Sequence, residues 1–384
     1  MLAMNYRGPY RVRASQKPEP KIEHPEDVIV RVTRACICGS DLHIYHGLVP
    51  DTRVGTTFGH EFIGEVVEVG SDVKKMKVGD QILVPFNISC GRCAFCKQEL
   101  FSNCHESNPE ATAAGGIFGY SHTGGGFDGG QAEYVRVPYA DVGPMVIPSD
   151  IHPDDAVLLT DVFPTGYQAA EMGGIKPGDT VVVFGAGPVG LMAARSAWFF
   201  GAGRVIIIDR VEYRLEFAKT FAHCEAYNFE SIGDPVLFLK KQTGYFGADV
   251  CIDAVGCEAA GSALQTITGK KLMLQAGSAT ALHWAINSVK KGGIVSIVGV
   301  YGPTDNLIPI GNVVNKGLTI RADQCSVKRL LPKLISHIRE GYIRPRDIIT
   351  HHVPLEEVSD AYHIFSAKLD NCIKTVLIPP SARN

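Results

Sequence analysis

The chain has no long hydrophobic run and no strong excess of charge of either sign. No uninterrupted apolar stretch reaches the about 18 residues needed to cross a bilayer. The opening segment, MLAMNYRGPYRVRA, contains no apolar core of signal-peptide type. We therefore expect no membrane partner and a cytoplasmic location. The formal net charge is -3 and no long lysine and arginine run occurs, which argues against nucleic acid as a partner and favours a small molecule.

Cysteine is also sparse, at 11 of 384 residues, which is too small a share for a disulfide scaffold. A hydrophobic content of 45% is ample for two cores, and the length exceeds what one core usually supports. Two globular domains are therefore expected. The clustering of the cysteines favours metal binding in a reducing compartment.

One cluster stands out because its spacing is C-x2-C-x2-C-x7-C. Its members are Cys90, Cys93, Cys96 and Cys104. Four thiolates this close in sequence can enclose one tetrahedral zinc ion. An iron-sulfur cluster is the alternative metal. Four unrelated buried thiols would be the non-functional interpretation, but such residues rarely crowd among polar neighbours such as Arg92 and Lys97.

The chain changes character along its length. Residues 26–86 contain short β-branched runs separated by turn residues, which predicts a mainly β domain. After residue 176, strand-like and helix-like segments alternate, which predicts a doubly wound parallel sheet and an α/β fold class. The glycine-rich segment 115–135 is interrupted by aromatic residues, so we expect an ordered loop. From about residue 321 an amphipathic helix and a final strand follow.

The first predicted strand of the α/β region ends in a glycine-rich turn. The turn reads Gly185, Ala186, Gly187, Pro188, Val189, Gly190 and precedes a helical segment. An isolated G-x-G-x-x-G is often an ordinary turn, but between a strand and a helix it is typical of dinucleotide binding, because it lets a backbone approach a pyrophosphate.

Asp209 ends the next predicted strand, where an acidic residue contacts the ribose hydroxyls of NAD. Its charge would repel the extra phosphate of NADP, although the adjacent Arg210 would tolerate that phosphate if it turned inward. Arg214 either covers the ribose or adenine of the cofactor or is a solvated charge on the following helix.

A second group of metal-ligand residue types lies in the β region. Cys38 occurs in ACICGSDLHIYHG, and His60 and Glu61 occur in TTFGHEFIGEVVEVG. Neither piece alone predicts a site, because a lone cysteine is usually an inert core thiol. The prediction of a metal site therefore rests on their joint occurrence.

The pattern Gly59-His60-Glu61-x2-Gly64-x5-Gly70 resembles the zinc signature of the zinc-containing medium-chain alcohol dehydrogenase family. The resemblance covers nearly the whole chain and includes CGSDLH, the four-cysteine lobe, the glycine turn and Asp209 in the expected order. It implies a GroES-like, mainly β catalytic domain over residues 1–162, completed by 321–384, and a Rossmann NAD-binding domain over 163–320. It also implies a homotetramer.

The same resemblance implies two zinc ions per subunit. Cys38, His60 and Asp161 would ligate a catalytic zinc, with Glu61 close by and able to exchange with water, and the four-cysteine lobe would hold a structural zinc. Asp161 departs from the family's usual cysteine, and LLTDVFPTGYQAA is similar to the segment of glutathione-independent formaldehyde dehydrogenases. A carboxylate donates less electron density than a thiolate, so the metal would be a stronger Lewis acid. The alternative for Asp161 is a helix N-cap or a turn residue before Pro164.

The family's proton relay maps onto Ser40 and His43. The implied reaction is hydride transfer to NAD from an alcohol or from a hydrated aldehyde such as formaldehyde, whose hydrate is a geminal diol. Two other functions stay open. One is a polyol or threonine-type zinc dehydrogenase, and the other is a non-catalytic NAD-binding zinc protein.

Three further features allow alternative interpretations. Phe86 either lines the substrate pocket or is plain core. Lys374 either approaches the cofactor pyrophosphate or is solvated. The segment 256–284 resembles an insertion of the formaldehyde dehydrogenase group, where it accompanies tightly held NAD and aldehyde dismutation.

Overall fold

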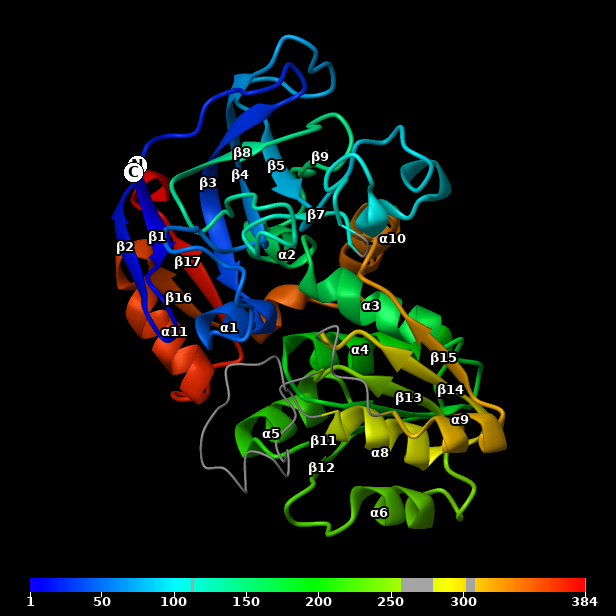
Figure 1. The fold of residues 1–384 in the computed structure, drawn as a ribbon. Helices are drawn as coiled ribbons and strands as arrows, with labels where there is room; N and C mark the ends of the chain where they lie inside the picture. Colours follow the sequence, from blue (N-terminus) through cyan, green and yellow to red (C-terminus); the bar gives the residue numbers. More distant parts are fainter. Residues whose placement is uncertain (112–113, 257–278, 302–307, 384) are drawn as a thin grey trace. The chain divides into compact units, whose positions relative to one another are not determined.

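The computed structural model describes residues 1–383 except 112–113, 257–278 and 302–307. The chain forms two compact units, of which the first comprises Met1–Pro164 with Ser326–Asn384 and the second Thr165–Cys325 (Figure 1). The boundaries expected from the sequence, after residues 162 and 320, lie a few residues earlier. The predicted α/β class, with one mainly β unit and one doubly wound unit, is confirmed.

The first unit is organised by a 7-stranded sheet in the order β16-β17-β3-β4-β5-β9, with β8 also pairing with β3. Two 2-stranded sheets, β1-β2 and β6-β7, accompany it. The strands are β1 (Leu2–Tyr6), β2 (Val12–Gln16), β3 (Val28–Ile37), β4 (Phe62–Val69), β5 (Gln81–Val84), β6 (Asn87–Ile88), β7 (Gly116–Ile117), β8 (Tyr134–Val137), β9 (Met145–Val146), β16 (Ile349–Pro354) and β17 (Lys374–Ile378).

Strand β3 is the central element of this sheet. Its residues Val28, Val30 and Val32 recur with the two-residue period of a strand and are fully buried in one hydrophobic cluster. The strand pairs antiparallel with β4 and with β17. Its last residues therefore lie beside the start of both neighbours, and this is where the candidate site forms.

The first unit also contains α-helices. They are α1 (Gly39–Tyr45), α2 (Pro153–Leu158), α10 (Val327–Arg339) and α11 (Val358–Ala367), and α3 (Val162–Met172) begins here and continues into the second unit. The amphipathic helix predicted after about residue 321 is α10, and Pro332 lies inside it. The glycine-rich segment predicted as an ordered loop packs closely, since a Cβ on Gly130 would lie 2.3 Å from the Phe62 ring.

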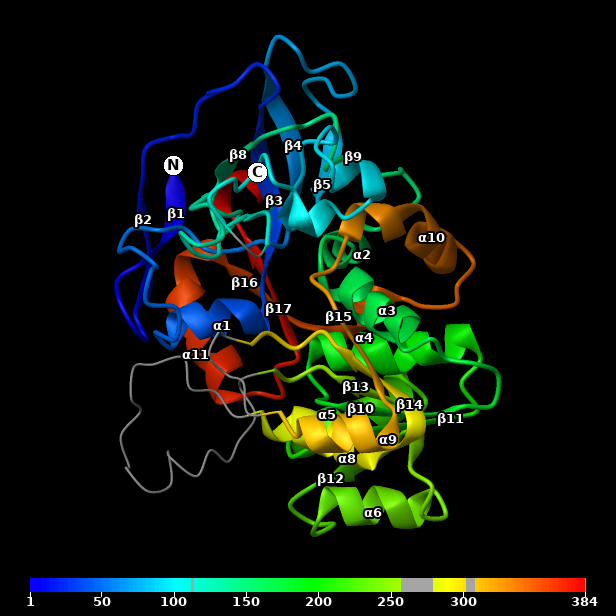
Figure 2. The same cartoon turned by 45° about the vertical axis from the view of Figure 1, so that its right-hand side comes forward.

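The second unit contains a 6-stranded parallel sheet in the order β12-β11-β10-β13-β14-β15 (Figure 2). This is the doubly wound order, with the direction of winding reversing between β10 and β13. The strands are β10 (Thr180–Phe184), β11 (Arg204–Asp209), β12 (Glu225–Asn228), β13 (Ala248–Asp253), β14 (Val289–Ile297) and β15 (Thr319–Ala322). In such sheets ligands bind at the carboxyl ends of the strands near the reversal.

The helices of this unit are α4 (Pro188–Ala197), α5 (Glu212–Phe221), α6 (Pro235–Gln242), α8 (Thr280–Ser288) and α9 (Ile310–Lys316). Helices α4 and α5 contact β10, β11 and β12, whereas α8 contacts β13 and β14 and also packs against α6. Right-handed crossovers place these two sets on opposite faces of the sheet. None of the described helices combines the length and apolar character needed to cross a membrane.

Candidate metal centres and nucleotide-binding turn

The first candidate centre forms where β3 ends and β4 begins. Cys38 follows β3 directly and precedes α1, while His60 and Glu61 precede β4. The antiparallel register, with Ala35 opposite Phe62, brings these two chain segments together, and the Cys36 amide donates a hydrogen bond to the Glu61 carbonyl at 2.9 Å. Asp161 joins them from the residue before α3.

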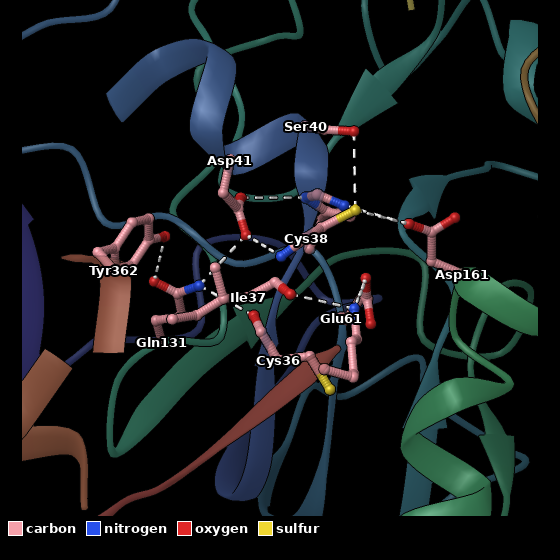
Figure 3. Close-up of polar contacts among 11 residues, drawn as sticks. Cys36, Ile37, Cys38, Ser40, Asp41, Glu61, Gln131, Asp161 and Tyr362 are labelled. Atoms are coloured by element: carbon pink, nitrogen blue, oxygen red, sulfur yellow. Dashed lines mark hydrogen bonds and ion pairs between the residues drawn. The ribbon is translucent and has the colours of Figure 1, made fainter. Parts of the chain in front are cut away.

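The side chains of Cys38, His60, Glu61 and Asp161 converge on one point. One ligand atom from each lies within 4.8 Å of all the others, and all four residues are buried. Asp161 Oδ2 lies 3.2 Å from His60 Nε2 and 3.6 Å from Cys38 Sγ (Figure 3). Although Asp161 stands immediately before a helix, its carboxylate faces the other candidate ligands.

Buried negative charge dominates this centre. Asp41, Glu61 and Asp161 are all buried, and the cations facing them are Lys374 and, when protonated, His60. Buried ionised carboxylates are costly unless they are paired or coordinate a metal. The cluster therefore has the charge and the donor atoms of a cation site.

Lys374 is the residue whose role sequence reasoning missed. It is fully buried at the start of β17, where its Nζ donates to Glu61 Oε1 at 2.6 Å and to the Ile37 carbonyl at 3.1 Å. It is therefore not solvated, and its described contacts are with the metal-ligand cluster rather than with the glycine turn. Its position at the head of the apolar strand KTVLI was the available signal.

The pKa shifts describe a site in which proton and metal would compete. Burial raises the pKa of Cys38 to about 11, with further contributions from the charges of Glu61 and Asp161. Burial alone would lower the pKa of His60, but Asp41 and hydrogen bonds to Asp161 and Cys38 raise it well above its usual value. Metal ligands must be deprotonated, so a bound cation would displace protons from both residues.

Burial raises the pKa of Glu61, and the ammonium group of Lys374 only partly opposes that effect. Burial would lower the pKa of Lys374, but the charges of Glu61, Cys36 and Cys38 together outweigh it and raise that pKa. Glu61 Oε2 has no hydrogen-bond partner among the residues that the structure describes. That oxygen is therefore an acceptor available to a ligand.

The predicted relay residues lie on α1. Ser40 is half-buried, with its Oγ 3.8 Å from Cys38 Sγ, and His43 is buried one helical turn further along. Phe86 is also buried and packs against the candidate ligand His60, with ring centroids 5.9 Å apart at 69°. Its position beside the centre is compatible with a pocket wall.

The second candidate centre is the four-cysteine lobe. The sulfur atoms of Cys90, Cys93, Cys96 and Cys104 lie within 4.8 Å of one another. Backbone amides donate to three of them, with N to Sγ distances of 3.3 Å onto Cys104 and 3.4 Å onto Cys90 and Cys93. Each cysteine in the described part of the chain is a free thiol. Burial raises the pKa of Cys93, but backbone hydrogen bonds lower it by more, to about 6.

The glycine turn lies between β10 and α4, as predicted. Gly187 is the N-cap of α4 and Pro188 follows it in the first helical turn, with Val189 half-buried beside it. A Cβ on Gly190 would lie 1.8 Å from the Gly185 carbonyl oxygen, so only glycine fits there. A Cβ on Gly187 would meet nothing closer than the Arg214 guanidinium at 3.8 Å, which leaves room for a ligand at the helix N-terminus.

Asp209 lies at the end of β11, beside this turn. Its Oδ2 accepts a hydrogen bond from the Ala186 amide at 2.6 Å, and its Oδ1 accepts from the Arg210 and Val211 amides at 2.6 and 2.9 Å. Arg210 is exposed. Arg214 is buried, at 8% exposure, and its Nε has no hydrogen-bond partner among the described residues, so its interpretation as a solvated charge is wrong.

The predicted insertion, residues 256–284, falls largely on 257–278, which lie outside the described residues.

Two family models match the chain. Residues 24–148 match the alcohol dehydrogenase GroES-like domain, and residues 188–274 match the zinc-binding dehydrogenase model. The first match spans β3, β4 and the four-cysteine lobe, and the second begins at α4.

Curated relatives resemble the chain over most of its length. It is 43% identical over 381 residues to an uncharacterized zinc-type alcohol dehydrogenase-like protein, AdhB, of Bacillus subtilis, which covers 99% of this chain and 100% of that protein. It is 38% identical over 313 residues to a glutathione-independent formaldehyde dehydrogenase of Pseudomonas aeruginosa, covering 78% of this chain and 75% of the relative.

Solved structures of alcohol dehydrogenases have a similar fold. An alcohol dehydrogenase from Thermus sp. ATN1 superposes with a TM-score of 0.83 at 33% identity, covering 99% of this chain and 100% of the other. An Escherichia coli CFT073 alcohol dehydrogenase complexed with the cofactor NADH has a TM-score of 0.78 at 26% identity and covers 98% and 99%. Matching zinc-type relatives in both sequence and fold over nearly its whole length, this chain belongs to the zinc-containing medium-chain alcohol dehydrogenase family.

Proposed function

We propose that the protein is a zinc-dependent, NAD-linked dehydrogenase that oxidises small alcohols or hydrated aldehydes, with formaldehyde hydrate as the favoured class. The observation that carries this proposal is the buried convergence of Cys38, His60, Glu61 and Asp161 within 4.8 Å. Membership of the family supports an oxidoreductase activity. The two candidate metal centres support zinc as a cofactor, and the glycine turn supports NAD.

The first centre fits zinc. Thiolate, imidazole and carboxylate are the donors that zinc binds in proteins, and three protein ligands with one open position are typical of a catalytic site. Cys38, His60 and Asp161 would hold the ion. The excess of buried carboxylate over buried cation supports a divalent metal there. When bound, zinc supplies a Lewis acid that lowers the pKa of a hydroxyl group.

Glu61 is the adjustable member of the cluster. Lys374 holds its Oε1 at 2.6 Å, and Oε2 carries no hydrogen bond within the described chain. The ammonium group of Lys374 lowers the pKa of Glu61 and so partly opposes the effect of burial on that carboxyl group. In the proposed function Cys38, His60 and Asp161 would hold the metal, and Glu61 would be the neighbouring carboxylate able to exchange with water.

Proton removal is assigned to α1. Ser40 lies at the edge of the centre, with its Oγ 3.8 Å from Cys38 Sγ, so it can accept a hydrogen bond from a substrate hydroxyl there. His43 lies on the same helical face one turn later and would accept the proton next as a general base. Phe86, packed edge-on against His60, would exclude water from one side.

The second centre is proposed to hold a structural zinc, which brings the number of ions to two per subunit. Four sulfur atoms at these spacings form a closed tetrahedral site with no open position. The backbone amides that point at the sulfurs stabilise the thiolate forms. An iron-sulfur cluster would use the same donors, but membership of a family of zinc-type dehydrogenases favours zinc.

NAD is the proposed hydride acceptor. The turn at Gly185, Gly187 and Gly190 leaves space at the N-terminus of α4, and Asp209 stands beside it with its carboxylate fixed by three amides. A negative charge there disfavours the 2′-phosphate of NADP. Arg214 would contact the cofactor, because its guanidinium lies near Gly187 and its Nε has no hydrogen-bond partner among the described residues. A solved neighbour that contains NADH supports this choice.

Two observations support the substrate class. The carboxylate of Asp161, rather than a thiolate, faces His60 and Cys38, which increases the Lewis acidity of a metal bound there. A formaldehyde dehydrogenase is among the relatives. An aldehyde hydrate has two hydroxyls on one carbon, so loss of one proton and one hydride from it yields a carboxylic acid, just as an alcohol yields an aldehyde.

The testing experiment measures NADH formation by zinc-loaded protein with formaldehyde, short primary alcohols, polyols and threonine, with formate and methanol quantified in the same samples. We expect turnover of formaldehyde with NAD. Formate and methanol in equal amounts without free NADH would show that one aldehyde is oxidised while another is reduced on retained cofactor.

The Asp161→Ala variant tests the assignment of the metal ligands. We expect it to lose turnover and one zinc equivalent while keeping NAD binding. Turnover of polyols or threonine alone would replace the proposed substrate class. NAD binding without turnover of any compound would indicate a non-catalytic protein. We also predict a homotetramer, which light scattering would test, and a cytoplasmic location.

A further inference from the structure

Behind the first centre, a chain of buried side chains runs from α11 to the candidate ligand His60. Its members are Tyr362, Gln131, Asp41 and His60, with exposures of 0%, 0%, 0% and 3%. All four belong to the first unit, and Figure 3 shows the first three joined by hydrogen bonds, with Asp41 also bonded to the Cys38 backbone. Fully buried polar chains of this kind either fix a geometry or carry an energetic cost.

The first link fixes the orientation of an amide. The Tyr362 hydroxyl donates to Gln131 Oε1 at 2.9 Å. Gln131 Nε2 then donates to the Cys36 carbonyl at 2.9 Å and to Asp41 Oδ2 at 3.3 Å. A rotated amide would place its oxygen against those two acceptors and its nitrogen against a hydroxyl donor. The Cys36 carbonyl and the Asp41 carboxylate can only accept, so they select the orientation in which the amide donates to Asp41, and the Tyr362 hydroxyl stabilises that orientation by donating to Oε1.

The second link fixes the Asp41 carboxylate. Its Oδ2 accepts from Gln131 Nε2 and also from the Cys38 amide at 2.9 Å. Its other oxygen, Oδ1, consequently faces His60 Nδ1 at 3.4 Å. A carboxylate beside Nδ1 favours the tautomer that carries its proton there, which leaves Nε2 with its lone pair. Nε2 is the atom that faces Asp161 Oδ2 at 3.2 Å.

The backbone also ties Gln131 to the ligand segment. The backbone N–H of Gln131 donates to the Phe58 carbonyl at 3.1 Å, and the backbone N–H of Gly130 donates to the Gly59 carbonyl at 2.7 Å. Gly59 has a φ of +98°, and a Cβ there would lie 2.4 Å from Gln131 Cγ. The residue immediately before His60 is thus shaped to admit this glutamine.

We propose that Tyr362 and Gln131 are positioning residues for the metal site, which orient Asp41 so that it holds His60 in the metal-binding tautomer. This proposal rests on the assignment of His60 as a ligand in the proposed function. It predicts that removal of one hydroxyl group on α11 weakens metal binding at His60 without disturbing the four-cysteine lobe.

The experiment uses Tyr362→Phe, which keeps the ring in the core and removes only the hydroxyl. Gln131→Met keeps an unbranched side chain and removes the amide, and it decides the matter if Tyr362→Phe fails to fold. Tyr45→Phe is the matched control, because Tyr45 packs against Tyr362 with ring centroids 5.2 Å apart and belongs to the same hydrophobic cluster, while its change leaves the chain to Asp41 intact.

Zinc affinity is measured for each protein by competition with a chelator, and the geometry of the site by the absorption spectrum of the cobalt-substituted protein. The Asp161→Ala variant identifies which metal equivalent belongs to the first centre. We expect Tyr362→Phe and Gln131→Met to weaken that equivalent about tenfold, the lower end for partners that orient a metal-bound histidine, and to change its cobalt spectrum. Tyr45→Phe should match the wild-type protein.

Unchanged affinity and spectrum in both test variants would overturn the proposal, as would an equal loss in Tyr45→Phe, because that would reflect packing alone. Failure of the underlying metal site has a different signature. Wild-type protein that binds a single equivalent, insensitive to Asp161→Ala, would overturn the proposed function and this inference together.

Discussion

The buried pair of Lys374 and Glu61 allows a quantitative prediction. In Lys374→Met the apolar stem of the side chain remains, while the ammonium group is lost. That group makes two contacts, at 2.6 Å to Glu61 Oε1 and at 3.1 Å to the Ile37 carbonyl, and both side chains are 0% exposed. The variant therefore contains a buried carboxylate without its cation.

The size of the effect follows from that burial. Removing one partner of a buried ion pair costs about 3–5 kcal/mol, because the remaining charge is uncompensated. We expect Lys374→Met to lose that much unfolding free energy at pH 8. The double variant Lys374→Met with Glu61→Gln should lose less than the sum of the single changes, by about 1–3 kcal/mol, because the stranded charge is gone.

The loss should also depend on pH. Burial already raises the pKa of Glu61 above its usual value, and loss of the lysine raises it further. A carboxyl group whose pKa is higher in the folded than in the unfolded protein favours folding in its protonated form. The penalty in Lys374→Met should therefore be small near the unfolded pKa of about 4.3 and grow as the pH rises toward 8.

The assay is urea unfolding of EDTA-treated protein, followed by circular dichroism, so that bound metal does not replace the missing cation. Hydrogen exchange should locate the loss of protection in β3 and β17 and leave β10 and β11 unaffected. Lys290→Met is the matched control, since Lys290 pairs with Asp249 at side-chain exposures of 43% and 23%, and such a pair contributes at most about 1 kcal/mol. A loss in Lys374→Met no larger than in this control would refute the reasoning.

Three further predictions concern the four-cysteine lobe, the glycine turn and the stability of the protein at alkaline pH. Cys93→Ser should remove one zinc equivalent, measured by metal analysis, and lower the melting temperature, whereas unchanged stoichiometry would mean that the lobe holds no metal. Gly190→Ala should abolish NAD binding measured by calorimetry or prevent folding, since its Cβ would lie 1.8 Å from the Gly185 carbonyl oxygen; wild-type NAD affinity would contradict the structure of the turn. Burial raises the pKa of Tyr362 well above 10.0, so this residue's contribution to stability is complete below pH 10 and decreases above it by about 1.4 kcal/mol per pH unit. Tyr362→Phe should make the alkaline decline in unfolding free energy shallower by that amount, and an identical slope would show that the hydroxyl ionises freely in the folded protein.

Local features of this chain could be predicted from sequence. The four cysteines of the lobe fall within one short segment, so few backbone paths connect them and their spacing already suits a closed metal site. The turn at Gly185, Gly187 and Gly190 is likewise local, since a strand before it and a helix after it follow from hydrophobic periodicity. The alternation of strands and helices after residue 176 predicted the doubly wound sheet for the same reason.

Long-range partners could not be predicted in this way. Lys374 and Glu61 are 313 residues apart, and the apolar strand that begins at the lysine indicates burial but does not identify Glu61 as its partner. The burial of Arg214 beside Gly187 was equally undetermined, because a charged residue in an amphipathic helix is normally assigned to the solvent face.

By itself, the sequence determined the residue types able to bind metal, the dinucleotide turn and the family resemblance, because these depend on short spacings and characteristic patterns. Only the tertiary structure decided which charges are buried, that Lys374 faces Glu61, and that Tyr362 and Gln131 stand behind Asp41. The physical reason is that burial and pairing depend on which strand edges and helices meet. In this protein the pairing of β3 with β4 and β17 joins segments from both ends of the chain.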